Sequence, residues 1–556
     1  MNPKNLKNSA FCMLIFVMLS TIFSCKKSLD QSLSITPHNS VTDLSVWSST
    51  STADVFLNSI YGYLPDGNNW YDPFDNWSDN SICGFSWVLS RTQAQQSTQT
   101  PSTLAWWGGW TTGYPYDWSS NYNYIRACNV FITKVAASSL DTGYKRERIA
   151  EVRFLRAYFY QNLWMAYGGV PIITVPLDAT SQGDSIFHAR NTWAETYQFI
   201  TTELAAAAED LPINAAESGR ATKGAALTLK GWVELFDHQY TASAATNMEV
   251  VNMGVYSLFP DYGGLFMPAN NVNSEGIFYR EYIPNVLGGR ADSFDGPTFT
   301  AGGSETSWGG VNPTQELVDD YDMDNGKTIS DPTSGYNPQK PYVNREPRFY
   351  QSIVYDGSYW YNDTIYTRQG IGSPNEIDLS DHNDATQTGY YQRKGLNDKI
   401  TLGADNWNNG TSGQNYYYFR YADVLLNYAE AQNEAVGPDG SVYNAVNQIR
   451  ERAQLPDLTP GLSQDAMRTA IRRERRVELA FEGKRYWDLI RWGIAGTNLN
   501  RQLHGIAITS TNGVLNYAPV TVPGGDQKFD ASKNNLFPIP QSAIDQNKNL
   551  TQNPGY

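Results

Sequence analysis

The amino-acid sequence predicts a mostly α fold, in which pairs of helices form a tetratricopeptide-like scaffold that carries large loop-rich insertions and minor β structure. Three observations predict it. Several segments repeat apolar residues at three- and four-residue spacing, the period of an amphipathic helix. Many of these segments lie in adjacent pairs with short connectors, as stacked helix hairpins require. Between them lie long stretches rich in Gly, Asn, Asp, Pro and aromatic residues with little helical period.

The first element is a signal peptide over residues 1–24. Lys4 and Lys7 precede an apolar run over 10–23 that only Ser20 and Thr21 interrupt. This run is shorter than the roughly 20 apolar residues that a membrane-spanning helix needs, and no later segment is long enough. We therefore expect the mature chain not to be transmembrane.

Cys25 follows the small residue Ser24 at the end of the apolar run, as in a bacterial lipoprotein whose cysteine is acylated after cleavage. The alternative is an ordinary signal peptide with an incidental cysteine, because Phe23 is bulkier than the usual residue at its position. Residues 25–45 are polar and non-periodic, which is typical of a flexible tether. The folded part is expected to begin near Val46.

The clearest helix is predicted over residues 144–167. Its apolar residues include Ile149, Val152, Leu155 and Phe159, and Gly168 with the next glycine ends the pattern. Further helices are predicted at 52–64, 120–137, 192–209, 221–240, 419–436, 440–453 and 463–492. Within an N-terminal region over 46–255 and a C-terminal region over 256–556, the loop-rich insertions occupy 66–118 and 256–416, and the last helices occupy 419–492. The aromatic content of the insertions argues against disorder.

Composition narrows the range of ligands. The net charge of −15 and the pI of about 4.9 work against binding to nucleic acid or to anionic lipids. The chain has 16 Trp and 36 Tyr, and flat rings beside amides and hydroxyls suit a ligand with flat faces and many hydroxyls, as sugars have. Beyond Cys25 only Cys83 and Cys128 remain in the mature chain, so one disulfide is possible and a disulfide framework is not.

Three carboxylates stand four residues apart at Glu474, Glu478 and Glu482, on one face of a predicted helix. Paired carboxylates are typical of glycosidases. However, six arginines and a lysine surround them, which keeps carboxylates ionised, whereas a general acid needs a raised pKa. We interpret this segment as an ion-pair lattice between helices, and we expect no catalytic residues in the chain.

The segment from Asp320 to Gly326 superficially resembles a calcium loop, with further aspartates at 322 and 324. Its glycine falls one place too late for an EF-hand, and the twelfth position is Asp331 where that loop has glutamate. A surface turn is the preferred interpretation, with incidental calcium binding as the alternative. The histidines are scattered without ligand spacing, so neither a metal centre nor a cofactor is expected.

Sequence motifs near the C-terminus carry a family resemblance. They read FRYADVLLNYAEA at 419–431, NQIRERA at 447–453, IRRERRVELAFEGKRYWDLIRWG at 471–493, LFPIP at 536–540 and LTQNPGY at 550–556. In the N-terminal half the matching motifs are SIY at 59–61, FLRAYF at 154–159, YGGVP at 167–171 and GRATKGAA at 219–226. The middle adds DY at 261–262, LF at 265–266 and NREPRF at 344–349. The chain resembles the SusD/RagB family from the signal peptide to the last residue.

The resemblance implies a non-enzymatic lipoprotein of the outer membrane, facing the cell exterior, which captures a nutrient and passes it to a SusC-like TonB-dependent transporter. A glycan is the expected ligand, and a peptide is the alternative within the family. A surface glycoside hydrolase is the alternative from another class. One departure concerns the surface location, because acidic residues often follow the lipidated cysteine in surface-exported lipoproteins, whereas Lys26 and Lys27 follow it here.

The resemblance also places the ligand site between the N-terminal insertion and the middle loops, where an aromatic arc lies near hydrogen-bonding side chains. Seven tryptophans fall within residues 70–118, and about half of them are expected to pack the insertion onto the scaffold. These seven are Trp70, Trp77, Trp87, Trp106, Trp107, Trp110 and Trp118. By region, the expected ligand contacts are Trp106 and Trp107 as stacking platforms, Asp79 and Arg91 as hydrogen-bonding partners, and Trp308 and Trp360 from the far side, with Trp77 as a further contact. Trp487 and Trp492 are expected in the core.

Overall fold

The structure is a computed structural model that describes residues 46–556 except 70–71, 104–114, 302–303, 381–384 and 400–409. The predicted signal peptide, the lipidated Cys25 and the tether lie outside the described residues. So do Trp106 and Trp107. These remain predictions.

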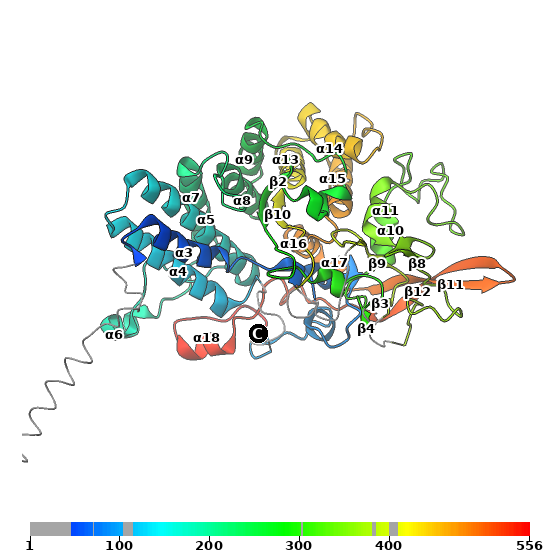
Figure 1. Ribbon diagram of the computed structural model, residues 1–556, viewed down its shortest axis with the longest axis horizontal. Coiled ribbons are helices and arrows are strands. Elements are labelled where there is room, and N and C mark those ends of the chain that lie inside the picture. The colour runs from blue at the N-terminus through cyan, green and yellow to red at the C-terminus, as the bar shows by residue number, and fades with distance from the viewer. Residues whose placement is uncertain (1–45, 70–71, 104–114, 302–303, 381–384, 400–409) are drawn as a thin grey trace, which may run out of the picture.

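Stacked helix pairs form the scaffold (Figure 1). Along the chain, α4 packs on α5, α5 on α7, α7 on α8 and α8 on α9; α9 then packs on α13, which also contacts α14 and α15. The helices of the N-terminal half are α3 (Thr50–Tyr61), α4 (Trp118–Ala137), α5 (Thr142–Tyr167), α6 (Ala179–Gln182), α7 (Trp193–Asp210), α8 (Lys223–Phe236) and α9 (Tyr240–Asn252). Those that follow are α10 (Gln315–Asp320), α11 (Pro347–Ser352), α13 (Tyr421–Val436), α14 (Gly440–Arg452), α15 (Gln464–Glu478), α16 (Arg485–Arg491), α17 (Ala495–Asn498) and α18 (Gln541–Gln546). The predicted mostly helical fold is confirmed.

Local sequence explains where the long helices begin and end. The side chain of Asp141 caps α5 by accepting from the backbone N–H of Tyr144, and Gly168, with a φ of 80°, ends the helix as predicted. Thr192 and Glu195 form a capping box at the start of α7.

Two predicted helices differ from the structure. The helix predicted over 463–492 is split into α15 and α16, because Phe481 and Gly483 adopt left-handed conformations with φ of 63° and 69°. The carboxylate of Asp75 holds this break by accepting from the backbone N–H groups of Phe481 (3.0 Å) and Gly483 (2.8 Å). The helix predicted over 221–240 ends at Phe236, and α9 follows it as a separate helix that the prediction missed.

The β structure is minor, and every sheet among the described residues has two antiparallel strands. The long hairpin β11 (Gln502–Thr511) and β12 (Val514–Asp526) projects from one end of the molecule (Figure 1). The other pairs are β1 (Ser81–Ile82) with β5 (Asn312–Pro313), β2 (Gly276–Arg280) with β10 (Tyr416–Arg420), β3 (Phe299–Ala301) with β4 (Ser304–Thr306), β6 (Ile353–Val354) with β9 (Tyr391–Gln392), and β7 (Tyr359–Trp360) with β8 (Asp363–Thr364). Two of these pairs join segments that are distant in the sequence. β1 lies in the N-terminal insertion and its partner β5 in the middle insertion. β2 lies near the start of the middle insertion, and its partner β10 begins where that insertion ends.

The main hydrophobic core runs through the helices, with α5 buried over most of its length, and smaller clusters lie under the middle loops. Trp487 is in this core, as predicted. Cys83 and Cys128 are both buried, and no disulfide joins them. Among the described helices, none combines the length and the apolar character that crossing a membrane requires.

Candidate functional site

Trp77 lies in the interior, with 2% of its surface exposed. It stacks on Phe74 with ring centroids 4.9 Å apart, and it packs against Tyr486 and Phe537. The expectation that Trp77 contacts a ligand is therefore corrected. Its ring anchors the N-terminal insertion on the C-terminal helices, which is the packing role expected of about half of these tryptophans.

Asp79 is also buried, and its carboxylate forms ion pairs with arginines. Arg485 donates from two nitrogens at 2.7 and 2.9 Å, and Arg501 donates at 3.0 Å. Burial raises the pKa of Asp79, but the guanidinium groups of Arg476, Arg485 and Arg501 outweigh it and hold the pKa well below its usual range. The predicted ligand contact is corrected, because this carboxylate is committed to an internal ion pair.

Arg91 fills a similar internal role. It donates to the carbonyl oxygens of Cys83 (2.7 Å) and Pro523 (3.2 Å) and to Oε1 of Gln387 (2.9 Å), and it is 6% exposed. These bonds tie the N-terminal insertion to β12 and to the middle insertion. The structure thus places Arg91 as a support beneath the loops, which corrects its assignment as a ligand contact.

Trp308 is half-buried and lies where two insertions meet. Its ring stacks on Phe294 (centroids 6.2 Å apart, 24° between planes) and packs against the cluster of Cys83, Phe85 and Val88. Of the predicted contacts that the structure describes, only Trp308 keeps a partly exposed ring.

Trp87 is the exposed ring that the sequence-based choice missed. It is 55% exposed, and Phe85 backs it with the two rings stacked 5.9 Å apart. We call the surface formed by Phe85, Trp87, Phe294 and Trp308 the aromatic face. Its two outer rings each rest on an inner phenylalanine, which fixes them as flat platforms.

Close backbone contact holds the two halves of this face together. The N–H of Gly84 donates to the carbonyl oxygen of Gly309 at 3.2 Å, next to the β1–β5 pair. A Cβ placed on Gly84 would lie 2.2 Å from that oxygen, so only glycine allows the approach. The spacing of the rings therefore depends on Gly84.

On β7, the exposed aromatic ring belongs to the residue before the predicted Trp360. Trp360 is buried in a cluster with Val354, Tyr391 and others, with the guanidinium of Arg393 5.5 Å from its ring centroid. Its neighbour Tyr359 is 58% exposed, because successive side chains of a strand point to opposite faces. The predicted contact at Trp360 is corrected, and Tyr359 is the ring of β7 that faces solvent.

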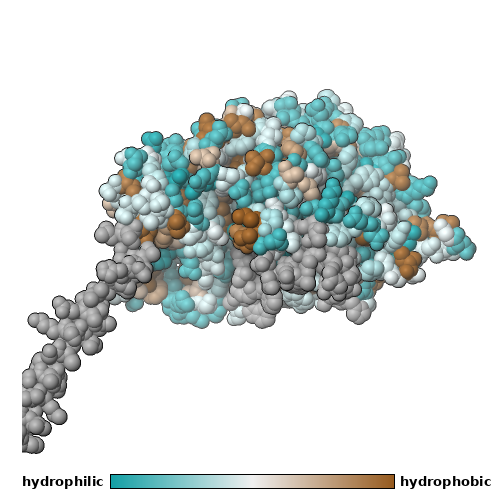
Figure 2. Space-filling view, in the orientation of Figure 1, coloured by the Kyte–Doolittle hydropathy of each residue, from teal (hydrophilic) through white to brown (hydrophobic). Residues whose placement is uncertain are grey.

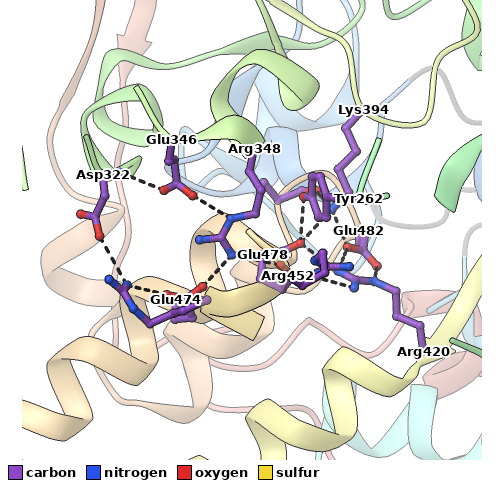
Figure 3. A network of polar contacts seen from close by, with 12 residues as sticks. Tyr262, Asp322, Glu346, Arg348, Lys394, Arg420, Arg452, Glu474, Glu478 and Glu482 are labelled. Carbon is purple, nitrogen blue, oxygen red and sulfur yellow. Dashed lines mark hydrogen bonds and ion pairs between the residues drawn. The ribbon is translucent and has the colours of Figure 1, made fainter. Parts of the chain in front are cut away.

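The carboxylates of α15 form the predicted ion-pair lattice, which Figure 3 shows from close by. The carboxylate of Glu478 forms ion pairs with the guanidinium groups of Arg420 (N–O distance 2.6 Å), Arg348 (3.0 Å) and Arg452. Burial raises the pKa of Glu478, but Arg452, Arg420 and Arg348 together hold it well below its usual range. A carboxylate held ionised in this way cannot act as a general acid.

The lattice joins α15 to the insertions, because Glu346 and Arg348 belong to the middle loops and Arg420 ends β10. The aspartates of the supposed calcium loop also face arginines, with Asp322 paired to Arg473 and Arg450. In the part of the chain that the structure describes, no three His, Cys, Asp or Glu residues are grouped to hold a metal ion.

Comparison with known proteins decides the family. A model described as the SusD family matches residues 274–556, just over half of the chain. The chain belongs to the SusD family. A second model, described as starch-binding associating with outer membrane, matches residues 41–233.

Similar proteins cover most of the chain. A SusD-like protein of Bacteroides fragilis has a solved structure with a TM-score of 0.77 and 28% identity, covering 94% of this chain and 100% of that one. A SusD-like carbohydrate binding protein of the same species has a TM-score of 0.77 and 27% identity, covering 91% and 100%. A SusD-like protein of Formosa agariphila is 27% identical over 79% of this chain and 80% of its own length.

In this SusD-family chain the aromatic face draws on both matched regions, since Phe85 and Trp87 lie within residues 41–233 and Phe294 and Trp308 within residues 274–556. The side of the molecule that Figure 2 shows is mostly hydrophilic, with separate apolar groups among its coloured residues. Exposed rings rigidly backed by buried rings are the arrangement that can bind a flat ligand without chemical change.

Proposed function

We propose that this SusD-family protein binds a glycan on its aromatic face, without breaking a bond, at the outer membrane. The observation that carries the proposal is the pair of platforms at Trp87 and Trp308, each stacked on a buried phenylalanine. Fixed rings lose little conformational entropy when a sugar ring stacks on them. The carbohydrate-binding relative in Bacteroides fragilis supports the same ligand class.

The proposal includes the anchoring and the partner. Cys25 carries the lipid, the chain faces the cell exterior, and the bound glycan passes to a SusC-like TonB-dependent transporter. The proposal keeps Trp106 and Trp107 as ligand contacts, because they belong to the same insertion of the sequence as Trp87. Mass spectrometry of the membrane fraction tests the acylation of Cys25, and co-purification of a transporter of this class with the tagged protein tests the partner.

Affinity gel electrophoresis and calorimetry against a panel of polysaccharides test ligand binding. Trp87→Ala and Trp308→Ala should each weaken binding of a retained polysaccharide about fivefold, equivalent to about 1 kcal/mol for a lost ring contact. Tyr63→Ala is the matched control, because Tyr63 is an exposed ring (39%) stacked on Tyr124 in the helical scaffold, and it should bind as the wild type does.

Three results contradict the proposal. Retention of no polysaccharide, or equal loss in the Tyr63 control, removes the aromatic face as a glycan site. Hydrolysis products that disappear when one carboxylate is replaced would show an enzyme. Binding of peptides in place of sugars would assign the alternative ligand of the family.

A further inference from the structure

An internal cavity lies between helix α5, strand β10 and the N-terminal insertion. Tyr158 and Asn162 line it from α5, Trp232 from α8, Phe74 from the insertion and Trp487 from α16. Every residue that lines it is buried or partly buried. The centres of water-sized molecules can occupy about 70 Å³ of it. Since one water needs roughly 10–15 Å³ on this measure, the cavity has room for about five waters.

A polar stripe of α5 faces this cavity. Tyr158, Gln161 and Asn162 lie three and four residues apart, which places them on one face of the helix, and all three line the cavity. Asn162 is 3% exposed, and among the described residues neither end of its side-chain amide has a hydrogen-bond partner. The same holds for the hydroxyl of Tyr158 and for Oε1 of Gln161, whose nitrogen donates to Sδ of Met165. Buried polar groups without partners are rare and costly, so these groups require an occupant of the cavity.

Lys484 brings an ammonium group to the same cavity from the break between α15 and α16. Its Nζ donates to the carbonyl oxygen of Tyr418 at 2.8 Å, and a carboxylate oxygen of Asp423 lies 3.7 Å away, too far for a good hydrogen bond. Because an ammonium has three N–H groups, two of them remain for other acceptors. The cavity thus joins an uncommitted part of Lys484 to the polar stripe of α5.

The mixture of groups around the cavity favours water as its occupant. Lys484 and the amide nitrogen of Asn162 can only donate, whereas Oε1 of Gln161 can only accept, and water both donates and accepts. A cation would lie beside the ammonium of Lys484, and an anion beside the carboxylate of Glu482, which also lines the cavity. An apolar molecule would leave the amides unpaired. Because buried and partly buried residues form the walls, water enters more readily than a molecule of the size of a sugar.

We propose that this cavity binds a cluster of about five ordered waters, which link the polar stripe of α5 to Lys484 by hydrogen bonds. Phe74 and Tyr116 of the N-terminal insertion also line the cavity, so the waters lie where this insertion meets the scaffold. They are a structural part of the junction under the insertion that carries Trp87. They are present whatever ligand the aromatic face binds.

A high-resolution crystal structure of the whole mature protein tests the proposal, together with a second crystal held under xenon gas. We expect separate water peaks within hydrogen-bond distance of the Asn162 amide, the Tyr158 hydroxyl and Nζ of Lys484. We expect no xenon in the cavity, because xenon enters dry, apolar cavities. A xenon peak there, a cavity without density, or density for an organic molecule overturns the proposal.

Urea unfolding of Asn162→Leu gives a second test, in which the sign of the change decides. With waters in the cavity, leucine removes their hydrogen bonds to the amide, and the equilibrium constant for unfolding should rise about fivefold, the factor for one hydrogen bond. In a dry cavity, leucine would instead remove a buried, unpaired amide, and the constant should fall. A fall, or no change, therefore overturns the proposal.

Asn444→Leu is the matched control for this substitution. Asn444 is an exposed residue of α14, where water reaches the amide in the folded and the unfolded protein alike, so the equilibrium constant should stay unchanged. An equal rise in this control would assign the effect to the helix and not to the cavity, which overturns the proposal. The crystal structure of the wild type decides without any variant having to fold.

Discussion

Replacing Arg420 with methionine should destabilise the protein by about 3 kcal/mol or more. Arg420 is fully buried, and its guanidinium donates to Glu275 and Glu478 at 2.6 Å and to Glu482 at 2.7 and 2.8 Å. Methionine has similar length and no charge, so Arg420→Met leaves these carboxylates buried without their shared partner. Removing one member of a buried ion pair costs about 3–5 kcal/mol.

The pKa of Glu482 gives an independent value for the free energy that these ion pairs contribute to stability. Burial raises this pKa, but Arg420 first and Lys394 second lower it from 4.5 to about 2. A depression of about 2.5 pKa units corresponds to about 3 kcal/mol of stability. Because the pKa in the folded state lies below that in the unfolded state, this contribution is present above pH 4.5 and is lost as the pH falls toward 2.

Urea unfolding, followed by circular dichroism and by tryptophan fluorescence, measures the effect. The difference in unfolding free energy between wild type and Arg420→Met should be largest at pH 7 and should shrink as the pH falls below 4.5. Arg468→Met is the matched control on α15, because Arg468 forms a partly exposed pair with Glu434 at 2.5 Å, and it should cost less than about 1 kcal/mol. A loss at Arg420 no larger than the control's, or a difference that does not change with pH, refutes this reasoning.

Three other substitutions test how the insertions are held. Gly84→Ala should weaken polysaccharide binding several-fold in calorimetry, because its Cβ would meet the carbonyl oxygen of Gly309. Gly440→Ala is the control and should bind normally, because a Cβ there meets nothing within 4 Å. Equal effects of the two substitutions would contradict the role of Gly84. Gly483→Ala should lower the unfolding free energy by about 1 kcal/mol in urea titrations, since its φ of 69° is costly for alanine, and an unchanged value would show that the break relaxes. Asp79→Asn should cost about 3 kcal/mol by the same measurement, because it leaves its buried arginine partners unbalanced, and a neutral result would mean that the ion pairs contribute nothing net.

The sequence predicted the helices well wherever a helix is defined by its own residues. The apolar period and the glycine at 168 predicted α5, and the structure confirms both. The break between α15 and α16 could not be predicted in this way, because the carboxylate that holds it belongs to Asp75, some 400 residues earlier in the chain. Local sequence there reads as one continuous amphipathic helix.

The candidate site was harder to predict, because residue type does not determine exposure. Asp79 and Arg91 have the side chains of ligand contacts, but partners distant in sequence occupy them. Trp360 and Tyr359 are adjacent aromatic residues, and only the register of a two-residue strand decides which one faces solvent. The signal that could have singled out Trp87 is weaker still: a second aromatic residue two positions earlier, placed to back its ring.

The buried charges explain why loops can present fixed rings. The N-terminal insertion is fastened to the C-terminal helices twice, by Asp79 with its arginines and by Asp75 at the break after α15, and Arg91 ties it to β12. Each fastening is directional and lies beneath the surface. The insertion therefore holds Trp87 in place with little secondary structure of its own, and ligand binding does not have to order it. The same reasoning predicts that Asp79→Asn, although remote from any ligand, weakens polysaccharide binding in calorimetry along with stability, whereas Arg468→Met leaves binding unchanged and costs less than about 1 kcal/mol of stability.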